Sequence, residues 1–473
     1  MLFSPSQRRK RPQLRLSERR LLLMAGDTLA VLLAVLLALY IWARIDDVPF
    51  DADYVLPNVF WFFLLSGVWL LLASANDFYD LDTASNRLRS MQLLALITGQ
   101  ILVLYLLVFF FSPRGSLPRL FILYFGVIAF VLIALWRLLN PALIGWASAP
   151  RRVLIVGVDD SAALIIDTIR QHHADGYVVY GIIGQNTDVG RVISGVPVIG
   201  AGRDIFNFVV RDRISELIIT SIPDVNGDIF RGVMDAYEYG VELMPMPLVY
   251  ERLTGRIPVK YVSNNWAIVL PITSGMIFNP YPFLQRIMDV VLATLGLALL
   301  LLALPLLALI IRLDSPGGIF YTQNRTGLNG RNFRIVKFRT MIQNAEAMTG
   351  AVFSQENDPR VTRVGRFMRK TRLDEVPQLL NVMRGEMSIV GPRPERPEHT
   401  RRLTEKIPFY RTRLVVRPGL TGWAQVRYRY GSDDEDAEMK LEYDLYYIRH
   451  QSLLLDISIM IRTVGKVLRM SGT

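Results

Sequence analysis

Two acidic residues stand side by side in a strongly basic part of this chain, at Asp374 and Glu375. A carboxylate is able to attack phosphorus and form an acyl phosphate. An anionic nucleophile approaches an anionic diphosphate only when arginines and a divalent metal ion cancel the repulsion. The nearby cations are suited to this task because arginine binds phosphate oxygens in a bidentate manner: Arg360, Arg363, Arg366, Arg369, Lys370, Arg372 and Arg393. The pattern predicts one acid as nucleophile and the other as a ligand of Mg²⁺, which prefers oxygen.

The same acid pair also has a purely structural explanation. Asp374, Glu375 and Pro377 fit the first turn of a helix, where proline is tolerated and acids are favoured by the dipole. An apolar stripe follows, and Gly385 fits a C-cap. An acid pair taken alone usually means only a helix start. The case for chemistry therefore depends on the clustered cations around it.

An upstream segment is expected to bring further cations to the acid pair. Residues 330–341 read GRNFRIVKFRTM, an alternating strand pattern that ends on Lys337 and Arg339. Across residues 320–420 there are 20 Lys/Arg against 9 Asp/Glu. Such an excess fits a solvated face beside anionic lipid as well as a site for phosphates, and the two are compatible.

Long apolar stretches in the first third predict four transmembrane helices over residues 21–145. Each is close to the ~20 residues that cross a bilayer: 21–43, 55–75, 91–111 and 119–140. Asp27 within the first predicts packing against other helices rather than lipid. The tail 1–20 holds seven Lys/Arg and is expected on the cytoplasmic side, so four crossings return the chain there at Arg151.

Strand and helix patterns alternate over residues 150–265 and predict a Rossmann-like α/β domain. The strand candidates are 153–158, 177–184, 216–220 and 241–247. The glycine pattern of dinucleotide sites is missing at the end of the first of them, where Gly157 and Val158 are followed by two aspartates. We expect Asp159 or Ser161 to cap a helix there instead.

A fifth apolar stretch, about Val290 to Ile311, has cations on both sides and contains Pro305. Proline removes a helix hydrogen bond. These features fit a broken, re-entrant membrane helix over 283–312 as well as an ordinary kinked span. The part that follows, 313–473, is expected to be a mixed α/β catalytic domain that ends in an amphipathic helix over 452–470.

Composition narrows the class of protein. Of the 473 residues, 51% are hydrophobic and the formal net charge is +11, which favours a multi-domain membrane protein over a nucleic-acid binder. The absence of cysteine removes disulfides, thiolate metal sites and thiol nucleophiles.

From about residue 283 to 473 the chain resembles the bacterial sugar transferase domain of polyprenyl-phosphate glycosylphosphotransferases. The resemblance rests on motifs in the family's order: DSPGGIFYTQNRTGLNGRNF and KFRTM; NDPRVTRVGRFMRKTRLDEVPQLLNVMRGEMSIVGPRPE; RPGLTGWAQV and YDLYYI. With its spans and α/β domain, the chain looks like the long members that initiate exopolysaccharide or O-antigen synthesis.

The resemblance implies a reaction and a location. A sugar 1-phosphate would pass from a UDP-sugar to undecaprenyl phosphate, giving undecaprenyl-diphosphate-sugar and UMP through a covalent aspartyl-phosphosugar intermediate. Mg²⁺ would be the cofactor, and the enzyme would lie in the bacterial inner membrane with its catalytic domain on the cytoplasmic side. The membrane and α/β portions offer surfaces for membrane lipid and for a homodimer.

Site residues are also implied by the resemblance. Asp374 matches the nucleophile, and Glu375 its acidic partner, both as candidate metal ligands. Asp444 matches a C-terminal acid of the site, and Pro305 the break of the membrane hairpin. The basic positions match residues that would hold substrate phosphates: Lys337, Arg339, Arg369 and Arg393.

Two alternatives remain at this point. One is a membrane-tethered NAD-dependent sugar-nucleotide oxidoreductase or epimerase that uses the α/β domain, against which the missing glycine pattern argues. The other is a non-enzymatic scaffold whose basic region binds anionic lipid. A scaffold would have no need of an acid pair beside clustered arginines.

Overall fold

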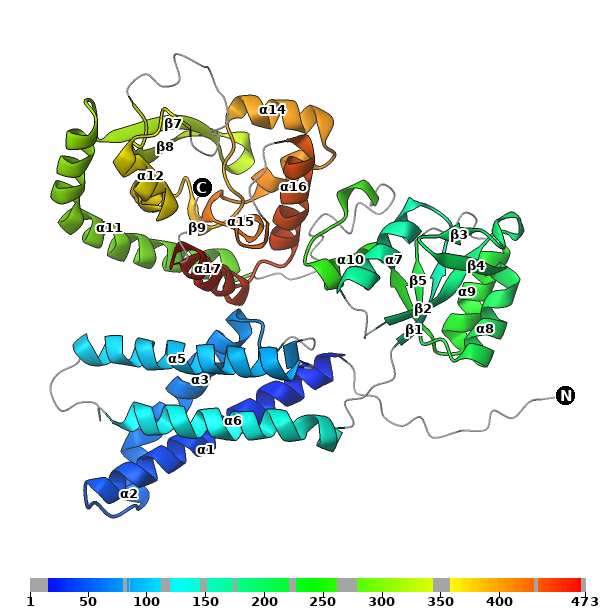
Figure 1. Cartoon of the computed structure of the whole chain (residues 1–473), viewed down its shortest axis with the longest axis horizontal. Helices are drawn as coiled ribbons and strands as arrows, with labels where there is room; N and C mark the ends of the chain where they lie inside the picture. The colour runs from blue at the N-terminus through cyan, green and yellow to red at the C-terminus, as the bar shows by residue number, and fades with distance from the viewer. Residues whose placement is uncertain are drawn as a thin grey trace. The chain divides into compact units, whose positions relative to one another are not determined.

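The computed structural model describes residues 16–79, 83–84, 86–111, 120–144, 151–172, 177–220, 227–261, 279–342, 358–428 and 433–468. The chain divides into two compact units, Met1–Ser148 and Ala149–Thr473. The second unit contains the α/β domain and the predicted catalytic region, and most of its helices and strands are labelled in Figure 1.

The first unit is helical throughout its described part. Its elements are α1 (Leu16–Ile45), α2 (Ala52–Val55), η1 (Leu56–Asn58), α3 (Val59–Ala75), α5 (Arg87–Phe111) and α6 (Phe121–Ile144). Helix α1 packs against α3 and α6, and α5 packs against the same two helices. Four segments here are long and apolar enough to cross a membrane by length and composition, as predicted. Their arrangement across a membrane as a four-helix bundle stays a prediction.

A buried ion pair confirms that Asp27 packs against neighbouring helices. The guanidinium of Arg137 on α6 donates to both carboxylate oxygens of Asp27, at 3.2 and 2.6 Å. The same guanidinium lies 4.0 Å from the ring centre of Phe78. A charge in an apolar helix is tolerated when it is paired in this way.

The α/β domain is a doubly wound sheet with strand order β3-β4-β2-β1-β5-β6. All neighbouring strands are parallel except β3 and β4. Its elements are β1 (Arg151–Val156), α7 (Asp160–His172), β2 (Tyr177–Gly184), η2 (Asn186–Asp188), β3 (Val192–Ile193), β4 (Val196–Ala201), η3 (Gly202–Asp204), α8 (Ile205–Asp212), β5 (Glu216–Ile219), α9 (Asp228–Glu238), β6 (Glu242–Pro245), α10 (Met246–Thr254) and η4 (Val259–Tyr261).

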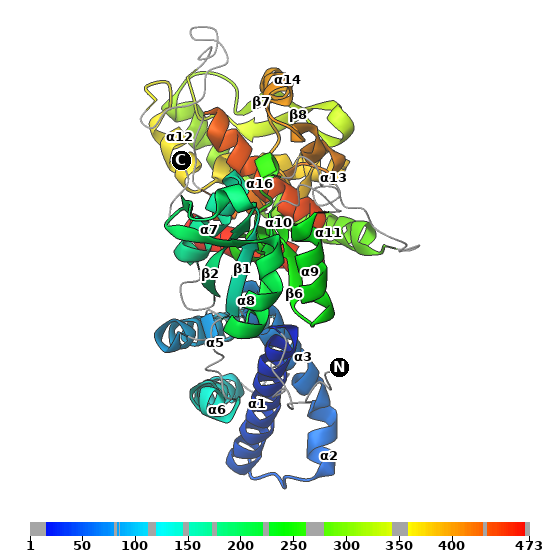
Figure 2. The ribbon, with the colours of Figure 1, turned by 90° about the vertical axis from the view of Figure 1, so that its right-hand side faces the viewer.

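Alternate residues of β1 face two separate cores, which explains its unbroken apolar run. Val153 and Ile155 pack with α7 and α10, and Leu154 and Val156 pack with α8 and α9 (Figure 1; Figure 2). The Asp159 carboxylate accepts a hydrogen bond from the Ala162 amide at 3.1 Å, which confirms the predicted cap. The Rossmann-like outline is therefore correct.

The catalytic region is built around two small sheets and many short helices. The pair β7–β8 is antiparallel, and β9–β10 is parallel. Its elements are α11 (Tyr281–Asp314), β7 (Phe320–Thr326), η6 (Leu328–Gly330), β8 (Asn332–Phe338), α12 (Arg363–Lys370), η7 (Leu373–Gln378), α13 (Leu379–Arg384), β9 (Ser388–Val390), α14 (Pro397–Lys406), η8 (Tyr410–Val415), β10 (Gly419–Thr421), α15 (Trp423–Arg427), α16 (Asp434–Arg449) and α17 (Leu453–Leu468).

Helix α11 continues through Pro305 instead of ending there. It bends part-way along its length in Figure 1, as a helix interrupted by proline does. Near its start, the Arg286 guanidinium donates to the Val382 carbonyl at 2.6 Å. At its end, the Asp314 carboxylate accepts from the Val364 amide at 2.9 Å. Both ends of the helix are thus bound to the same compact region.

Candidate active site

The acid pair lies at the start of a 3-10 helix, just after a tight turn. Arg372 adopts a left-handed conformation with φ 59°, which separates α12 from the 3-10 helix η7. Asp374 and Glu375 follow after Leu373 and are 7% and 6% exposed. Downstream, Gly385 closes α13 with φ 78°, as predicted for a C-cap. The helix-start signals are therefore real, but they do not explain why both carboxylates are buried.

Strand β8 is held against the turn by a buried amide. The Asn381 side chain donates to the Arg334 carbonyl at 2.7 Å and accepts from the Val336 amide at 3.1 Å. Asn381 is fully buried on α13. This clamp fixes the strand just before Lys337, so that the lysine amine is carried to the acid pair. Sequence reasoning missed Asn381 because an asparagine inside a short helix pattern gives no signal of its distant partner.

Glu375 is surrounded by cations from three segments. Its Oε1 accepts from Lys337 Nζ at 2.9 Å and from the Arg393 guanidinium at 2.7 Å, and its Oε2 lies 3.7 Å from Arg372. Burial acts to raise the pKa of Glu375, but Arg393, Lys337 and Arg372 outweigh it and hold the pKa well below its usual range. Glu375 is therefore a permanent anion that gathers these three cations.

Asp374 has a different environment, although it is the next residue. Among the described residues, none forms a hydrogen bond or an ion pair with the side chain of Asp374. Burial raises the pKa of Asp374, the charge of Glu375 raises it further, and Lys337, Arg369 and Arg372 oppose the rise. A buried carboxylate that is near cations but not bound to them is available for a reacting group.

The predicted phosphate-binding residues fall into two groups. Lys337 and Arg393 contact Glu375 directly, and Arg369 acts on Asp374 electrostatically while donating to Thr340 Oγ1 at 3.0 Å. Arg339 instead donates to the Ser315 carbonyl at 2.7 Å, at the end of α11. The strand ends before Arg339, and its guanidinium binds backbone carbonyls just beyond the end of α11.

Asp444 is connected to the charges around Glu375 indirectly, through Arg413. It is buried on α16 and forms an ion pair with Arg413 at 2.8 Å. Burial raises the pKa of Asp444 to about 6, and Arg413 opposes the rise. Arg413 in turn donates to the Arg393 carbonyl at 3.0 Å. Sequence reasoning missed Arg413 because it is one of many cations, and only the fold shows which of them is buried.

The donor set for a metal ion is small. Within the part of the chain that the structure describes, no three Asp, Glu, His or Cys side chains come together. Both oxygens of Glu375 already face cations, which leaves the Asp374 carboxylate as the better ligand. Such a site fits Mg²⁺, which commonly binds one or two carboxylates together with substrate phosphates.

Comparison with known proteins identifies the class. A family model described as "Bacterial sugar transferase" matches residues 280–470, the region that contains the site. A second model, described as "CoA-binding domain", matches residues 74–222. The chain is 45% identical over 186 residues, which are 39% of this chain and 69% of that protein, to a UDP-glucose:undecaprenyl-phosphate glucose-1-phosphate transferase of Caulobacter vibrioides. The chain belongs to the bacterial sugar transferase family.

Two longer matches extend this similarity. The chain is 39% identical over 253 residues to a UDP-N-acetylgalactosamine-undecaprenyl-phosphate N-acetylgalactosaminephosphotransferase of Aeromonas hydrophila, covering 52% of this chain and 58% of that protein. It is 33% identical over 331 residues to a UDP-glucose:undecaprenyl-phosphate glucose-1-phosphate transferase of Xanthomonas campestris, covering 67% of this chain and 66% of that protein. The chain thus spans somewhat more than half the length of these two relatives.

Proposed function

We propose that this chain transfers a sugar 1-phosphate from a UDP-sugar to undecaprenyl phosphate, as the first membrane step of exopolysaccharide or O-antigen synthesis. The observation that carries the proposal is the contrast within one dipeptide: Glu375 is bound by cations, whereas Asp374 is buried beside them without such a bond. The names of three relatives describe undecaprenyl-phosphate sugar phosphotransferases and so support this reaction.

The proposed chemistry has two displacement steps at one phosphorus atom. In the first, an oxygen of the Asp374 carboxylate attacks the phosphorus that carries the sugar. The bond to the bridging oxygen breaks, and UMP leaves with the electron pair. In the second, a phosphate oxygen of undecaprenyl phosphate attacks the same phosphorus, the bond to Asp374 breaks, and undecaprenyl-diphosphate-sugar is released. The carboxylate is regenerated, so no other reactant is consumed.

The cations around Glu375 are proposed to serve the phosphate oxygens. Lys337 carries more hydrogen-bond donors than its contact with Glu375 uses, and the Arg393 guanidinium carries five N–H donors in a planar fork suited to phosphate. Donors that are already oriented stabilise the charge of the transition state without reorganising. Glu375 acts here by holding these side chains in place, while Arg369 balances the charge on Asp374.

Mg²⁺ is proposed as the cofactor of this site. Asp374 would hold it together with the diphosphate oxygens, and Glu375 would contribute only by giving up one of its present contacts. The ion would supply Lewis-acid neutralisation of the phosphate charge. The role of Glu375 as a metal ligand remains a prediction.

The membrane position of the site is proposed from α11. This helix has 34 residues, and straight it would be about 50 Å long. Only 6% of its most apolar stretch is buried within the protein, so its surface is suited to lipid. Because both ends bind one compact region, a full crossing is disfavoured, and we propose that it enters and leaves one leaflet. The positive-inside rule puts that leaflet on the cytoplasmic side of the bacterial inner membrane.

The test is incubation of the full-length protein in detergent with undecaprenyl phosphate and a panel of radiolabelled UDP-sugars. Lipid-linked product from at least one donor is expected. The exposed α/β-domain variant Asp167→Asn provides the matched control, with unchanged product formation. Absence of product with every donor, from protein that remains folded, would refute the proposal.

A further inference from the structure

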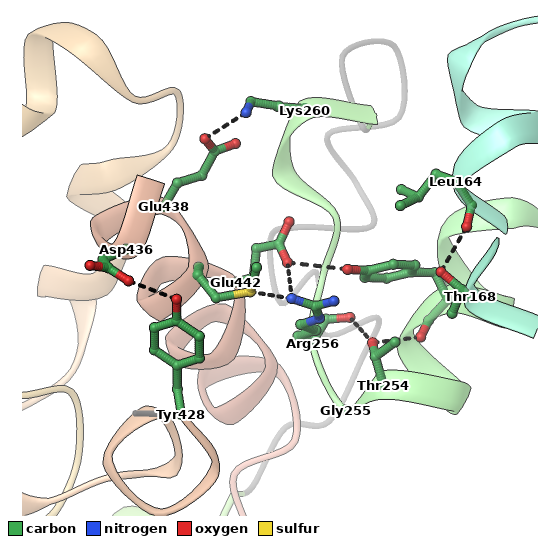
Figure 3. A network of polar contacts seen from close by, with 12 residues as sticks. Leu164, Thr168, Thr254, Gly255, Arg256, Lys260, Tyr428, Asp436, Glu438 and Glu442 are labelled. Atoms are coloured by element: carbon green, nitrogen blue, oxygen red, sulfur yellow. Dashed lines mark hydrogen bonds and ion pairs between the residues drawn. The ribbon is translucent and has the colours of Figure 1, made fainter. Parts of the chain in front are cut away.

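A buried polar seam joins the α/β domain to the catalytic region (Figure 3). On one side lies the segment 250–261, and on the other lies α16. The Glu442 carboxylate accepts from the Tyr250 hydroxyl at 3.4 Å and forms an ion pair with Arg256 at 3.6 Å. The Glu442 backbone carbonyl accepts from the Ile257 amide at 3.2 Å. One residue of α16 is therefore held by three residues of the other segment.

The segment 250–261 belongs to both hydrophobic cores. Tyr250 packs in the core of the α/β domain, whereas Ile257 and Val259 pack in the core of the catalytic region. A chain segment whose two halves are buried in different cores transmits displacement from one to the other. The seam is thus a packed connection and not a flexible linker.

The other face of α16 is connected to the active site by a series of side-chain contacts that begins at Asp444. Asp444 follows Glu442 by two residues, which puts it about 200° further around the helix. Asp444 pairs with Arg413, Arg413 donates to the Arg393 carbonyl, and Arg393 donates to Glu375. All of these contacts are 3.0 Å or shorter.

Charges buried at both faces of α16 oppose its displacement. Glu442 and Asp444 are 9% and 2% exposed, and Arg413 is 6% exposed. Separating any of them from its partner leaves an unpaired charge inside the protein, which is strongly unfavourable. A shift of α16 is therefore expected to carry Arg413 and the backbone of Arg393 along with it.

We propose that α16 couples the α/β domain to the active site, with Glu442, Asp444 and Arg413 as residues that position Arg393. This inference rests on the proposed function for its effect on catalysis. The α/β domain then contributes to binding of the UDP-sugar without contacting it. Any molecule that changes the conformation of the α/β domain would change the position of Arg393 by the same route.

The test combines a kinetic and a structural readout on the full-length protein. The variants are Glu442→Gln at the seam, Arg413→Lys behind Arg393, and the two together. The matched control is Lys260→Met, which removes an ion pair at the exposed edge of the same seam, where the lysine is 66% exposed. Deuterium exchange is followed in the peptide that contains Gly391 and Arg393.

The coupling predicts a particular pattern of KM values. Arg413→Lys is expected to raise KM for the UDP-sugar about tenfold and Glu442→Gln about threefold. Because Arg393 also stabilises the charge of the transition state, kcat should fall as well. The double variant should stay close to tenfold, because both changes act on one residue. Lys260→Met should leave KM within about 1.5-fold of the original.

Deuterium exchange separates this inference from the proposed function. Both single variants should accelerate exchange in the peptide around Arg393, whether or not the protein transfers a sugar. Wild-type protein without transfer would refute the proposed function but leave this readout intact. Unchanged exchange in Glu442→Gln, or KM effects that multiply to about thirtyfold in the double variant, would overturn the coupling.

Discussion

The two α/β parts of the second unit differ in what they bury. Within the described residues 151–261, the buried charged side chains are Glu216 and Glu251, and Glu251 faces the catalytic region through Arg449 at 2.8 Å. The described residues 279–468 bury many more: Asp289, Asp358, Asp374, Glu375, Arg413, Glu442, Asp444 and Asp456. Burying charge is costly, so a fold retains it where it has a task. The comparison indicates that residues 279–468 contain the reactive site, whereas the buried residues of 151–261 serve mainly in packing.

The largest effect is expected at Asp374. Asp374→Asn keeps the size of the side chain but removes the nucleophilic oxygen, and the rate of transfer should fall at least about a thousandfold. Radiolabelled product formation measures the rate, and thermal unfolding checks the fold. Asp167→Asn, the same change in the α/β domain, should have no effect. Full activity in Asp374→Asn would break the assignment of the nucleophile.

Removal of divalent metal is expected to be the next largest effect. Treatment with EDTA should reduce transfer about a hundredfold or more, because the diphosphate charge is then left to the arginines alone. Added Mg²⁺ should restore the rate. Turnover that persists after chelation would show that the reaction needs no metal ion, and it would leave the assignment of Asp374 as the nucleophile intact.

Neutralising Glu375 should lower kcat/KM to an intermediate degree and also shift the pH–rate profile. Glu375→Gln leaves Lys337 and Arg393 without their shared anion, and kcat/KM should fall about thirtyfold. The charge of Glu375 raises the pKa of Asp374, so its loss should lower that pKa and move the acid limb of the pH–rate profile to lower pH. An acid limb that stays in place or moves to higher pH would contradict the described coupling of the two acids.

The smallest expected effect is on the pH dependence of the stability of the fold. Burial raises the pKa of Glu442 to about 7, although Arg256 opposes the rise. The folded protein then holds this proton more tightly than the unfolded chain, so stability should be highest below the unfolded pKa and fall as pH rises to about 7. Glu442→Gln should flatten the fall in melting temperature over that range. An unchanged profile in Glu442→Gln would show that other groups cause it.

Periodicity predicted the larger elements well because a buried strand or helix leaves a local pattern. The run at β1 and the alternation at β8 are both strands, and the predicted amphipathic stretch contains α17. Strands β3 and β4 were missed: β3 has only two residues, and the pairing of β4 with β3 and β2 lies outside the local pattern. The tail 1–15 and the end of the amphipathic stretch lie outside the described residues.

The site was predictable in its residue types but not in its connections. Adjacent acids among arginines indicated phosphate chemistry, and the family motifs singled out Asp374. The different environments of Asp374 and Glu375 could not be predicted, because they depend on how β8 and the loop after β9 reach the turn. Arg413 and Asn381 were missed for the same reason, since their partners are distant in sequence.

The most direct test of the account is the mass of the protein after exposure to a UDP-sugar without undecaprenyl phosphate. We predict a covalent adduct equal to one sugar phosphate group, mapped by peptide analysis to Asp374 and lost when undecaprenyl phosphate is added. The Asp374→Asn variant should form no adduct. An adduct on another residue, or sugar transfer by protein that never carries an adduct, would contradict the central claim.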